Sequence, residues 1–397
     1  MDLLLHSTKN KVSTEIIISG SKSESNRLLI LQQLFSNIQI ENLSDSDDTE
    51  HLQHALFTNK KLIDIGHAGT AMRFLTAFFA TQENREIILT GSERMQNRPI
   101  KILVEALRNL GASISYFDKD GYPPLKITGK KLTKNKVQIN GNVSSQYISA
   151  LLLIAPNLEN GLKIELLGKI TSVPYIKMTL NLLEQIGVKT EFTKNIITIE
   201  SIKKIPSKTL VVESDWSSAS YWYSVISLSE IGSSIQLSAY KKESLQGDSC
   251  LAEIYNNFGV STVFHKNSIV ITKIKKLNPK LISQNLSNAP DIAQTIAVTC
   301  FGLGIACDLT GLHTLKIKET DRLEALKIEL TKLGAEITVT NESLHLKSAT
   351  KINKNIAIAT YNDHRMAMAF APLAIKVPIQ INNAEVVTKS YRNFWND

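Results

Sequence analysis

The sequence predicts an α/β protein that folds as two lobes built from six α/β units. Four segments each combine an amphipathic helix, a glycine and an alternating, strand-like stretch, and two further segments have the helix and the strand without the glycine. A chain of 397 residues also exceeds what one hydrophobic core usually holds, so two domains are expected.

The glycine marks the repeated segment. Gly111, Gly187, Gly259 and Gly334 follow one another at intervals of 72 to 76 residues. Before each glycine, apolar residues recur at spacings of three and four, which is the period of a helix, and the glycine stands where a helix C-cap is expected. Four copies at near-constant spacing indicate an internal repeat. The two segments without the glycine are residues 25–43 and 365–381.

Two connections are expected to separate the lobes. Gly20 and Ser21 close a first strand predicted over residues 15–19, and a polar stretch of small residues covers 212–220. Three units are assigned to each lobe on this count. The expected lobes are residues 21–213 and residues 1–20 together with 214–397.

Composition and charge favour a small anionic partner. The chain is 43% hydrophobic and 21% charged, as soluble globular proteins are, with a net charge of +8 and a pI near 9.1. Such a charge suits nucleic acid, an anionic membrane surface or small anionic substrates. The lysines are dispersed as doublets without a run of five like charges, and aromatic residues are not interleaved with them. We therefore expect neither a nucleic-acid partner nor a membrane partner.

Cysteine usage and the apolar segments point to the cytoplasm. Cys250, Cys300 and Cys307 are odd in number and show no CxxC spacing, as expected for buried thiols in a reducing compartment. Residues 1–10 lack the basic and apolar regions of a signal peptide. The longest apolar stretch, residues 295–306, is far shorter than a membrane span.

Arginine is rare and unevenly placed. Nine of the 45 basic residues are arginine, and six of the nine stand in short loop-like motifs. The planar guanidinium group binds carboxylate or phosphate through paired hydrogen bonds. Rarity in a lysine-rich chain explains the number of arginines but not their placement. The six are Arg27, Arg73, Arg94, Arg98, Arg322 and Arg365.

Two glycine-containing motifs open predicted helices. Residues 20–27 follow an apolar strand, so free backbone N–H groups at the helix start suit an anion, and Lys22 and Arg27 add positive charge. Residues 66–73 repeat the pattern, with glycine allowing a ligand close to the backbone. The alternative for both is a plain helix cap, with a serine in the first motif and Thr70 in the second.

Hydroxyl groups and carboxylates precede four more predicted helices. Residues 142–147 and 171–175 place hydroxyls before helices, which suits a phosphate or simple capping. Asp291 is a lone carboxylate before a fully apolar helix, where N-capping is an equal explanation. Residues 318–322 pack two cations and two acids before a helix that Thr320 could cap.

The motif at residues 362–365 differs from these. Asp363, His364 and Arg365 are three consecutive ionisable groups directly before an apolar helix. Capping needs only one of them, so the motif indicates a binding or catalytic site.

Together the motifs resemble those of the 5-enolpyruvylshikimate-3-phosphate synthase family. They occur in the same order and span nearly the whole chain. Related UDP-N-acetylglucosamine enolpyruvyl transferases lack several of them and commonly carry a cysteine in a flexible loop, whereas residues 91–98 contain none. The motifs are GSKSESNR, AGTAMR, RMQNRP, SSQY, SVPY, QGD, PDIAQT, KETDR, YNDHRMAMA and TKSYRNF.

The resemblance implies a fold and a reaction. The fold is a two-lobed inside-out α/β barrel, enolpyruvyl transferase-like, with three βαβαββ units in each lobe. The reaction transfers the enolpyruvyl group of phosphoenolpyruvate to the 5-hydroxyl of shikimate 3-phosphate and releases phosphate, on the shikimate pathway to chorismate and the aromatic amino acids. No metal or organic cofactor is implied. The protein is expected to be a monomer that glyphosate inhibits, whose lobes close on shikimate 3-phosphate because unneutralised cations repel one another in its absence.

The resemblance also assigns residues to roles. Both substrates carry phosphate and carboxylate, and the reaction moves protons to and from carbon and oxygen, so cations and paired acid–base groups are required. The residues implied for catalysis are Asp291, Glu319, Lys22 and His364. Those implied to bind shikimate 3-phosphate are Lys22, Ser23, Arg27, Ser144, Ser145, Gln146, Ser172, Tyr175, Asp291 and Lys318. Those implied to bind phosphoenolpyruvate are Lys22, Gly69, Arg98, Gln146, Arg322, Arg365 and Lys389.

The chain departs from the family pattern at a few positions. Phe74 stands where the family usually has proline, and Thr314 and Leu315 stand where many members have Asn-Trp. The stretch 51–66 is short for the family. None of these departures falls on a residue implied for catalysis.

Three alternatives to this reaction stay open. One is a UDP-N-acetylglucosamine enolpyruvyl transferase, another a basic nucleic-acid-binding protein, and the third a non-catalytic phosphate-binding homologue. A non-catalytic homologue has no need of Asp291, Glu319 and Lys22 together, so their joint presence argues against it.

Overall fold

The structure, a computed structural model, describes residues 1–6 and 11–397. The expectation drawn from residues 1–10 therefore lies partly outside the described residues. The chain packs as two compact units: the middle unit, Gly20–Val212, and the terminal unit, Met1–Ser19 with Glu213–Asp397. Among the described residues, no helix is both long and apolar enough to cross a bilayer.

The middle unit contains two four-stranded sheets with one strand order. In each sheet the first two strands are parallel and the other pairs are antiparallel. The first sheet has the order β4 (Leu62–Asp64), β5 (Glu86–Thr90), β7 (Leu125–Thr128), β6 (Ser113–Tyr116). The second has the order β8 (Lys136–Asn140), β9 (Leu162–Leu167), β11 (Ile196–Ile199), β10 (Thr190–Thr193). A separate parallel pair is β12 (Lys208–Val211) with β3 (Ile38–Glu41).

The terminal unit repeats the same sheet twice. The first has the order β2 (Ser13–Ile16), β13 (Ser234–Ser238), β15 (Ser268–Lys273), β14 (Val260–Phe264). The second has the order β16 (Leu281–Asn285), β17 (Ala306–Thr310), β19 (Ser343–Leu346), β18 (Ile337–Val339). Again the first two strands are parallel and the others antiparallel. A third sheet has the order β1 (Leu3–Leu5), β21 (Ile379–Ile381), β20 (Ile356–Ile358).

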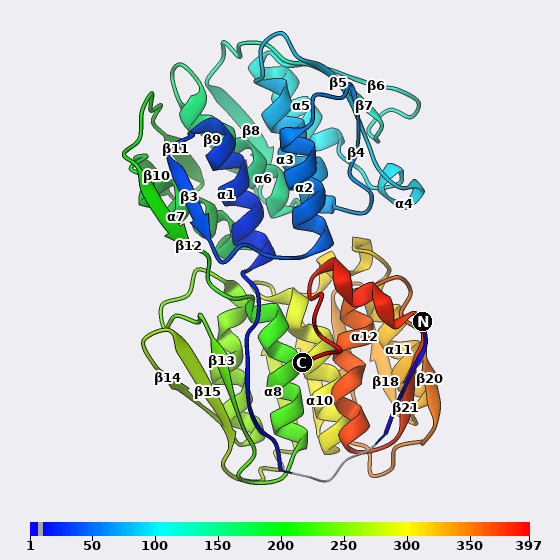
Figure 1. Cartoon of the computed structure of the whole chain (residues 1–397). Helices are drawn as coiled ribbons and strands as arrows, with labels where there is room; N and C mark the ends of the chain where they lie inside the picture. The colour runs from blue at the N-terminus through cyan, green and yellow to red at the C-terminus, as the bar shows by residue number, and fades with distance from the viewer. Residues whose placement is uncertain (7–10) are drawn as a thin grey trace. The chain divides into compact units, whose positions relative to one another are not determined.

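Buried helices form the core of the middle unit (Figure 1). Every residue of α3 is buried, and so are nearly all of α6, as expected for helices that are apolar on all sides. Helices α1, α3, α6 and α7 pack against one another. The helices of this unit are α1 (Lys22–Leu34), α2 (Asp47–Phe57), α3 (Gly69–Ala80), α4 (Glu93–Gln96), α5 (Lys101–Leu110), α6 (Ser145–Ile154), η1 (Ala155–Asn157) and α7 (Val173–Gln185).

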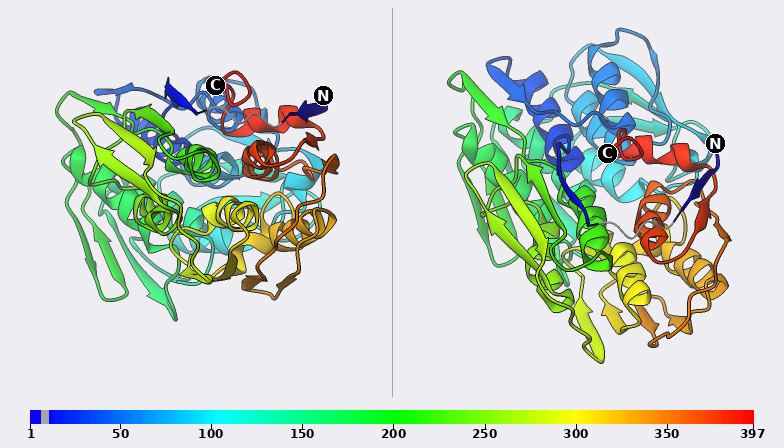
Figure 2. Two further views of the ribbon diagram at one scale, coloured as in Figure 1. Left: turned by 90° about the horizontal axis from the view of Figure 1, so that it is seen from below. Right: turned by 60° about the horizontal axis from the view of Figure 1, so that its bottom comes forward.

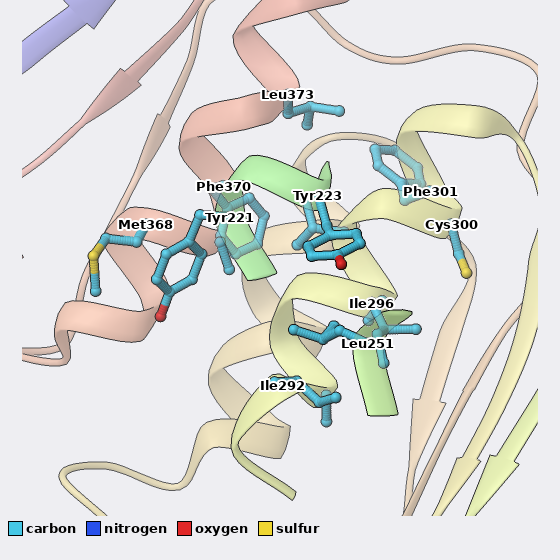
Figure 3. Packing of buried hydrophobic residues seen from close by; sticks show 14 of the residues in the cluster. Tyr221, Tyr223, Leu251, Ile292, Ile296, Cys300, Phe301, Met368, Phe370 and Leu373 are labelled. Carbon is cyan, nitrogen blue, oxygen red and sulfur yellow. The ribbon is translucent and has the colours of Figure 1, made fainter. Parts of the chain in front are cut away.

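In the terminal unit, α8, α10 and α12 lie side by side (Figures 1 and 2). Their side chains, among them Tyr223, Ile296 and Phe370, fill the core shown in Figure 3. The α-helices are α8 (Trp216–Leu228), α9 (Leu251–Ile254), α10 (Ala293–Leu303), α11 (Arg322–Lys332) and α12 (His364–Phe370). The 3₁₀ helices are η2 (Gly247–Cys250), η3 (Tyr255–Phe258), η4 (Pro290–Ile292), η5 (His313–Ile317), η6 (Ala371–Ile375) and η7 (Ala384–Lys389).

The glycine-ended repeat is confirmed. Gly111, Gly187, Gly259 and Gly334 have φ angles of 109°, 92°, 75° and 99°. Each follows a helix and lies in the left-handed region that favours glycine. Each glycine thus ends one helix and starts the strand of its own four-stranded sheet.

One predicted strand differs at its end, and two capping alternatives are wrong. The strand predicted over residues 15–19 is β2, which ends at Ile16, because it pairs only with Ser234–Leu237 of β13. Thr70 is not a cap, since α3 begins at Gly69 after Ala68, which places Thr70 in the first turn. Thr320 is not a cap either, because the carboxylate of Asp321 accepts the hydrogen bond from the N–H of Glu324.

Candidate active site

One arginine in the terminal unit binds three carboxylates. Arg322, the first residue of α11, has only 2% of its side chain exposed. Its Nε lies 2.6 Å from Oδ2 of Asp363, one terminal nitrogen lies 2.8 Å from Oδ1 of Asp291, and the other lies 2.7 Å from Oε2 of Glu319. All three distances are those of charge-assisted hydrogen bonds. The fork of Arg322 therefore fixes the positions of three acids at once.

The starts of three helices bring these residues together. Asp291 lies in η4, which leads into α10, and Glu319 lies in the loop before α11. Asp363 caps α12, its Oδ1 accepting from the N–H of Arg365 at 2.9 Å. Because α10, α11 and α12 pack against one another, their first turns meet. The N-cap residues of η4 and α10 are Ala289 and Ile292, so Asp291 is the N-cap of neither helix.

Further cations surround the two more exposed carboxylates. The Nζ of Lys389 lies 3.1 Å from Oε1 of Glu319. The Nζ of Lys318 lies 3.5 Å from Oδ1 of Asp291, and a terminal nitrogen of Arg365 lies 3.5 Å from its Oδ2. Each of these cations therefore has a carboxylate partner within the terminal unit. The closure of the lobes on shikimate 3-phosphate stays a prediction.

Asp291 is ionised in this arrangement. Burial alone raises the pKa of its carboxyl group, but the attraction of Arg365, Lys318 and Arg322 outweighs burial and holds that pKa well below its usual value. Burial also lowers the pKa of the Lys318 amino group, an effect that Asp291 partly offsets. The carboxylate is thus charged and able to accept a proton.

Two further polar side chains, Ser217 and Asp248, are linked to Arg365 by hydrogen bonds. A terminal nitrogen of Arg365 donates to Oγ of Ser217 at 3.2 Å, and that hydroxyl donates to Oδ2 of Asp248. Burial, followed by the nearby charge of Asp291, raises the pKa of Asp248 to about 7. Ser217 and Asp248 were not among the predicted site residues, although both stand in motifs that the sequence offered, the Ser-rich stretch of residues 212–220 and the QGD triplet.

His364 lies beside this network. Its ring is almost wholly buried, and its Nδ1 is 3.6 Å from Oδ1 of Asp363. The structure therefore brings six predicted residues of the terminal unit together around Arg322. They are Asp291, Lys318, Glu319, His364, Arg365 and Lys389.

In the middle unit, the guanidinium group of Arg27 is buried among neutral oxygens. It donates to Oγ1 of Thr179 at 2.8 Å, to Oγ of Ser149 at 2.9 Å and to the carbonyl oxygens of Ser23 and Tyr175. Burial lowers its pKa to about 10. These neutral partners hold the group in place without cancelling its charge, which leaves it attractive to an anion.

Phe74 lies against the same arginine. Its ring centroid is 5.4 Å from Cζ of Arg27, within the range of a cation–π contact. The ring of Tyr175 lies 6.0 Å from the same atom. The departure from the family pattern at position 74 thus adds an aromatic face to the Arg27 environment.

Two further arginines meet at Gly69. The carbonyl of Gly69 accepts from Arg73 at 3.1 Å, and a Cβ atom on Gly69 would lie 2.5 Å from a terminal nitrogen of Arg98. Burial, followed by the charge of Arg98, lowers the pKa of Arg73 to about 10. Glycine is therefore needed for Arg98 to approach this backbone, and two guanidinium groups concentrate positive charge beside it.

The other predicted residues of the middle unit lie at helix starts. Lys22 opens α1, with its Nζ 3.5 Å from Oδ2 of Asp48. Ser144 caps α6 by accepting from the N–H of Gln146, whose side chain donates to Oγ1 of Thr70 at 3.1 Å. These contacts link the first turns of α6 and α3.

Ser172 has an unusual backbone at the start of α7. Its φ of 53° lies in the left-handed region, which is uncommon for serine. Ser145 and Ser172 are 9% and 7% exposed, and the hydroxyl of the neighbouring Thr171 is buried without a hydrogen-bond partner. A strained residue beside an unsatisfied hydroxyl marks a place where a ligand is expected to complete the hydrogen bonds.

Comparisons with known proteins decide the family of this chain. A family profile described as EPSP synthase (3-phosphoshikimate 1-carboxyvinyltransferase) matches residues 52–397. A protein of Bacteroides fragilis (strain YCH46), named 3-phosphoshikimate 1-carboxyvinyltransferase, is 45% identical over 99% of this chain and 96% of the relative. The chain belongs to the EPSP synthase family.

More distant comparisons agree with this membership. A 3-phosphoshikimate 1-carboxyvinyltransferase of Histophilus somni (strain 2336) is 34% identical and aligns with 100% of this chain and 98% of its own length. A solved structure of EPSP synthase from Acinetobacter baumannii has a TM-score of 0.80 at 21% identity, covering 99% of this chain and 96% of that one. The predicted fold class and the resemblance to the EPSP synthase family are confirmed.

Proposed function

We propose that this protein transfers the enolpyruvyl group of phosphoenolpyruvate to the 5-hydroxyl of shikimate 3-phosphate and releases phosphate. Membership of the EPSP synthase family supports this reaction. The observation that carries it is the cluster around Arg322, where Asp291 and Glu319 are held among four cations. Such a cluster supplies both anion binding and acid–base groups.

The anionic groups of shikimate 3-phosphate are assigned mainly to the middle unit. Arg27 and Ser23 bind its carboxylate, since Arg27 keeps a buried charge among neutral partners. Hydroxyl groups at the starts of α6 and α7 bind its phosphate, as helix N-termini favour anions. Gln146 and Tyr175 lie beside the ring, and Lys318 contacts its hydroxyl groups. The phosphate-binding hydroxyls are those of Ser144, Ser145 and Ser172.

Phosphoenolpyruvate is assigned mainly to arginine side chains. Arginine suits its carboxylate and phosphate because the guanidinium group binds either with two parallel hydrogen bonds. Gly69 allows Arg98 to approach the backbone, and Gln146 is anchored to Thr70 beside it. The residues assigned to phosphoenolpyruvate are Lys22, Gly69, Arg98, Gln146, Arg322, Arg365 and Lys389.

Two carboxylates divide the proton transfers. Asp291 takes the proton of the 5-hydroxyl as the hydroxyl oxygen attacks C2 of phosphoenolpyruvate, while Glu319, in its protonated form, protonates the methylene carbon. In the tetrahedral intermediate, Glu319 takes a proton back from the methyl group as the C–O bond to phosphate breaks. The departing phosphate takes up the proton that Asp291 had accepted, so both carboxyl groups return to their starting states. Lys22 stabilises the departing phosphate, and His364 supports Asp363 behind Arg322. General acid–base catalysis of this kind contributes roughly 10²–10⁴-fold to a rate.

Substrate binding adjusts the basicity of Asp291. Three cations hold its pKa low in the protein without substrate, so Asp291 is then a weak base. When phosphoenolpyruvate engages Arg322 and Arg365, part of their charge is directed to the ligand instead. The pKa of Asp291 then rises towards that of a useful base.

The decisive experiment measures phosphate release. We expect the purified protein to release phosphate from shikimate 3-phosphate plus phosphoenolpyruvate, and to release none when either substrate is omitted. Replacing shikimate 3-phosphate by UDP-N-acetylglucosamine tests the alternative transferase. Binding of shikimate 3-phosphate without any phosphate release would instead favour a non-catalytic homologue.

Three further properties belong to this proposal. Glyphosate, an anion with a phosphonate and a carboxylate, is expected to compete with phosphoenolpyruvate for the same arginines. The protein is expected to work as a monomer in the cytoplasm. The free thiols of Cys250, Cys300 and Cys307 suit a reducing compartment.

A further inference from the structure

A chain of four hydrogen-bonded side chains lies on the β16–β17–β19–β18 sheet, apart from the residues assigned above. Oδ1 of Asp308 is 2.7 Å from Nδ1 of His345, and Nε2 of the same ring is 2.9 Å from Oγ of Ser343. Oγ of Ser343 is in turn 2.7 Å from Oγ1 of Thr340. All three distances are within hydrogen-bond range.

The sheet itself sets this arrangement. Asp308 on β17 is directly opposite His345 on β19, and Ser343 stands two residues before His345 on the same face. The residues between them point the other way: Leu309 and Leu344 are fully buried. The four polar side chains therefore share the face of the sheet opposite to the core.

The two ends of this series of hydrogen bonds, Thr340 and Asp308, determine which groups donate and which accept. Oγ1 of Thr340 accepts from the backbone N–H groups of Glu342 and Ser343, at 3.2 and 3.1 Å, so its own proton is directed to Oγ of Ser343. The ionised carboxylate of Asp308 only accepts, so Nδ1 of His345 carries a proton. In the neutral ring, which carries a single proton, Nε2 of His345 is then an acceptor, and the Ser343 hydroxyl donates to it.

These roles match those of an activated serine nucleophile. A serine, an imidazole that can take its proton and a carboxylate that orients the imidazole are recognised by geometry and role, whatever the fold that carries them. The array differs from a plain serine–threonine contact because an imidazole nitrogen accepts the serine proton.

We propose that Ser343, His345 and Asp308 form a second, esterolytic site, which accepts the acyl group of small activated esters. Oγ of Ser343 attacks the ester carbonyl carbon while its proton passes to Nε2 of His345. The bond from that carbon to the leaving oxygen breaks, and the leaving group takes the proton from Nε2. Water then attacks the acyl-serine with the same imidazole as base, which releases the carboxylic acid and restores the hydroxyl group.

Exposure and hydrogen bonding limit the substrate and the rate. Ser343 is only 7% exposed, whereas 43% of the His345 side chain is exposed, so a small acyl group such as acetyl is the one that reaches Oγ. The N–H of Ser343 is engaged by Thr340 and does not stabilise an oxyanion. The site therefore draws on general base catalysis alone, which is worth roughly 10²–10⁴-fold.

A purely structural role predicts the same hydrogen bonds but a different reactivity. Thr340 and Ser343 close the turn between β18 and β19, and their hydroxyl groups satisfy that turn. If turn closure is their only role, Ser343 reacts like any other serine in a sheet. Reactivity towards an ester separates the two roles.

The experiment treats the full chain with p-nitrophenyl acetate and locates acetyl groups by peptide mass spectrometry. Ser234 is the internal control, because its Oγ lies 2.9 Å from Oγ1 of Thr272 on another sheet, as part of a cross-strand hydroxyl pair. We expect acetylation of Ser343 to be at least about 10²-fold faster than that of Ser234, the lower bound for a general base. Equal rates at the two serines would overturn the proposal.

Substitution of the base and of the orienting acid tests the same point. His345→Gln is expected to remove the rate advantage of Ser343, and Asp308→Asn to reduce it, while thermal melting monitored by circular dichroism confirms that each variant is folded. Retention of fast Ser343 acetylation in His345→Gln would contradict the proposal. If His345→Gln does not fold, Asp308→Asn, which keeps the shape of the carboxylate, decides in its place.

Discussion

Nε of Arg322 and Oδ2 of Asp363 lie 2.6 Å apart, and both side chains are almost wholly buried. The carboxylates of Asp291 and Glu319, which bind the other two nitrogens of Arg322, are each 14% exposed. Asp363 is therefore the internal anchor of the arginine. Asp291 and Glu319 are the partners that a ligand can displace or use.

The first prediction concerns this anchor. Asp363→Asn removes the buried charge opposite Arg322, and breaking such a pair costs about 3 kcal/mol. Trp216, Trp222 and Trp395 are the three tryptophans of the chain, and all belong to the terminal unit. Urea unfolding followed by tryptophan fluorescence should therefore show a lower midpoint for that unit. Asp118→Asn, at an exposed position, should leave the midpoint unchanged.

Asp291 provides the second prediction. Asp291→Ala should lower kcat by roughly 10²–10⁴-fold, the usual contribution of a general base. Shikimate 3-phosphate should still bind, because its phosphate and carboxylate are assigned to other residues. Phosphate-release kinetics and calorimetric titration measure the two effects separately. Turnover like that of the wild-type protein would remove Asp291 from the mechanism.

Substitution of Arg98 tests whether phosphoenolpyruvate must be bound through paired hydrogen bonds. Arg98→Lys keeps the charge but loses the paired donors, so the KM for phosphoenolpyruvate should rise while that for shikimate 3-phosphate changes little. Arg94→Lys is the matched control, because Arg94 is an exposed arginine of α4, four positions before Arg98. Equal losses for both substrates in Arg98→Lys would indicate a structural loop.

Gly69 is predicted to act through Arg98. A Cβ atom at position 69 lies 2.5 Å from a terminal nitrogen of Arg98, so Gly69→Ala displaces the guanidinium group. The KM for phosphoenolpyruvate should rise, with little change in melting temperature, because a long side chain can move aside. In the double variant with Arg98→Lys, the losses should fall short of additive, since the two positions share one interaction. Full additivity would show that Gly69 acts independently.

The raised pKa of Asp248 predicts that the stability of the protein depends on pH. Its pKa is raised from 3.8 to about 7 in the folded protein, so the folded state binds one more proton than the unfolded state between these values. This contribution to stability is complete below the lower value and is lost as pH rises to the upper one, at about 1.4 kcal/mol per pH unit.

The variant Asp248→Asn isolates that contribution. It cannot titrate, so its stability relative to the wild-type protein should increase between about pH 5 and about pH 8. Tryptophan fluorescence during thermal unfolding at the two pH values measures the difference. A constant gap between variant and wild type would show that Asp248 is ionised in the folded protein throughout this range.

Local chemistry made the repeat predictable from the sequence. A glycine after an amphipathic stretch ends a helix whatever the tertiary structure, so the positive φ angles at Gly111 and Gly334 could be expected. The placement of arginine was informative for a similar reason. A buried guanidinium group needs several partners, and Arg27 and Arg322 each have them.

Contacts between distant segments could not be predicted in this way. Which hydroxyl or carboxylate caps a helix depends on where packing starts that helix, so Thr320 was considered as a cap where Asp321 is the one found. The partnership of Arg322 with Asp363 spans 41 residues of sequence and depends on how α11 and α12 pack.

The four sheets of identical strand order have a consequence for how this protein can change. Each sheet completes its own ladder of hydrogen bonds, and in each the edge strand follows a glycine-ended helix. The loops between strands are therefore free to specialise copy by copy. The β8–β11 copy carries serines at its helix starts, whereas the β16–β19 copy carries Asp291, Glu319 and Arg322 at the equivalent places. The same sheet is thus reused, while the side chains at the helix starts give each copy its own chemistry.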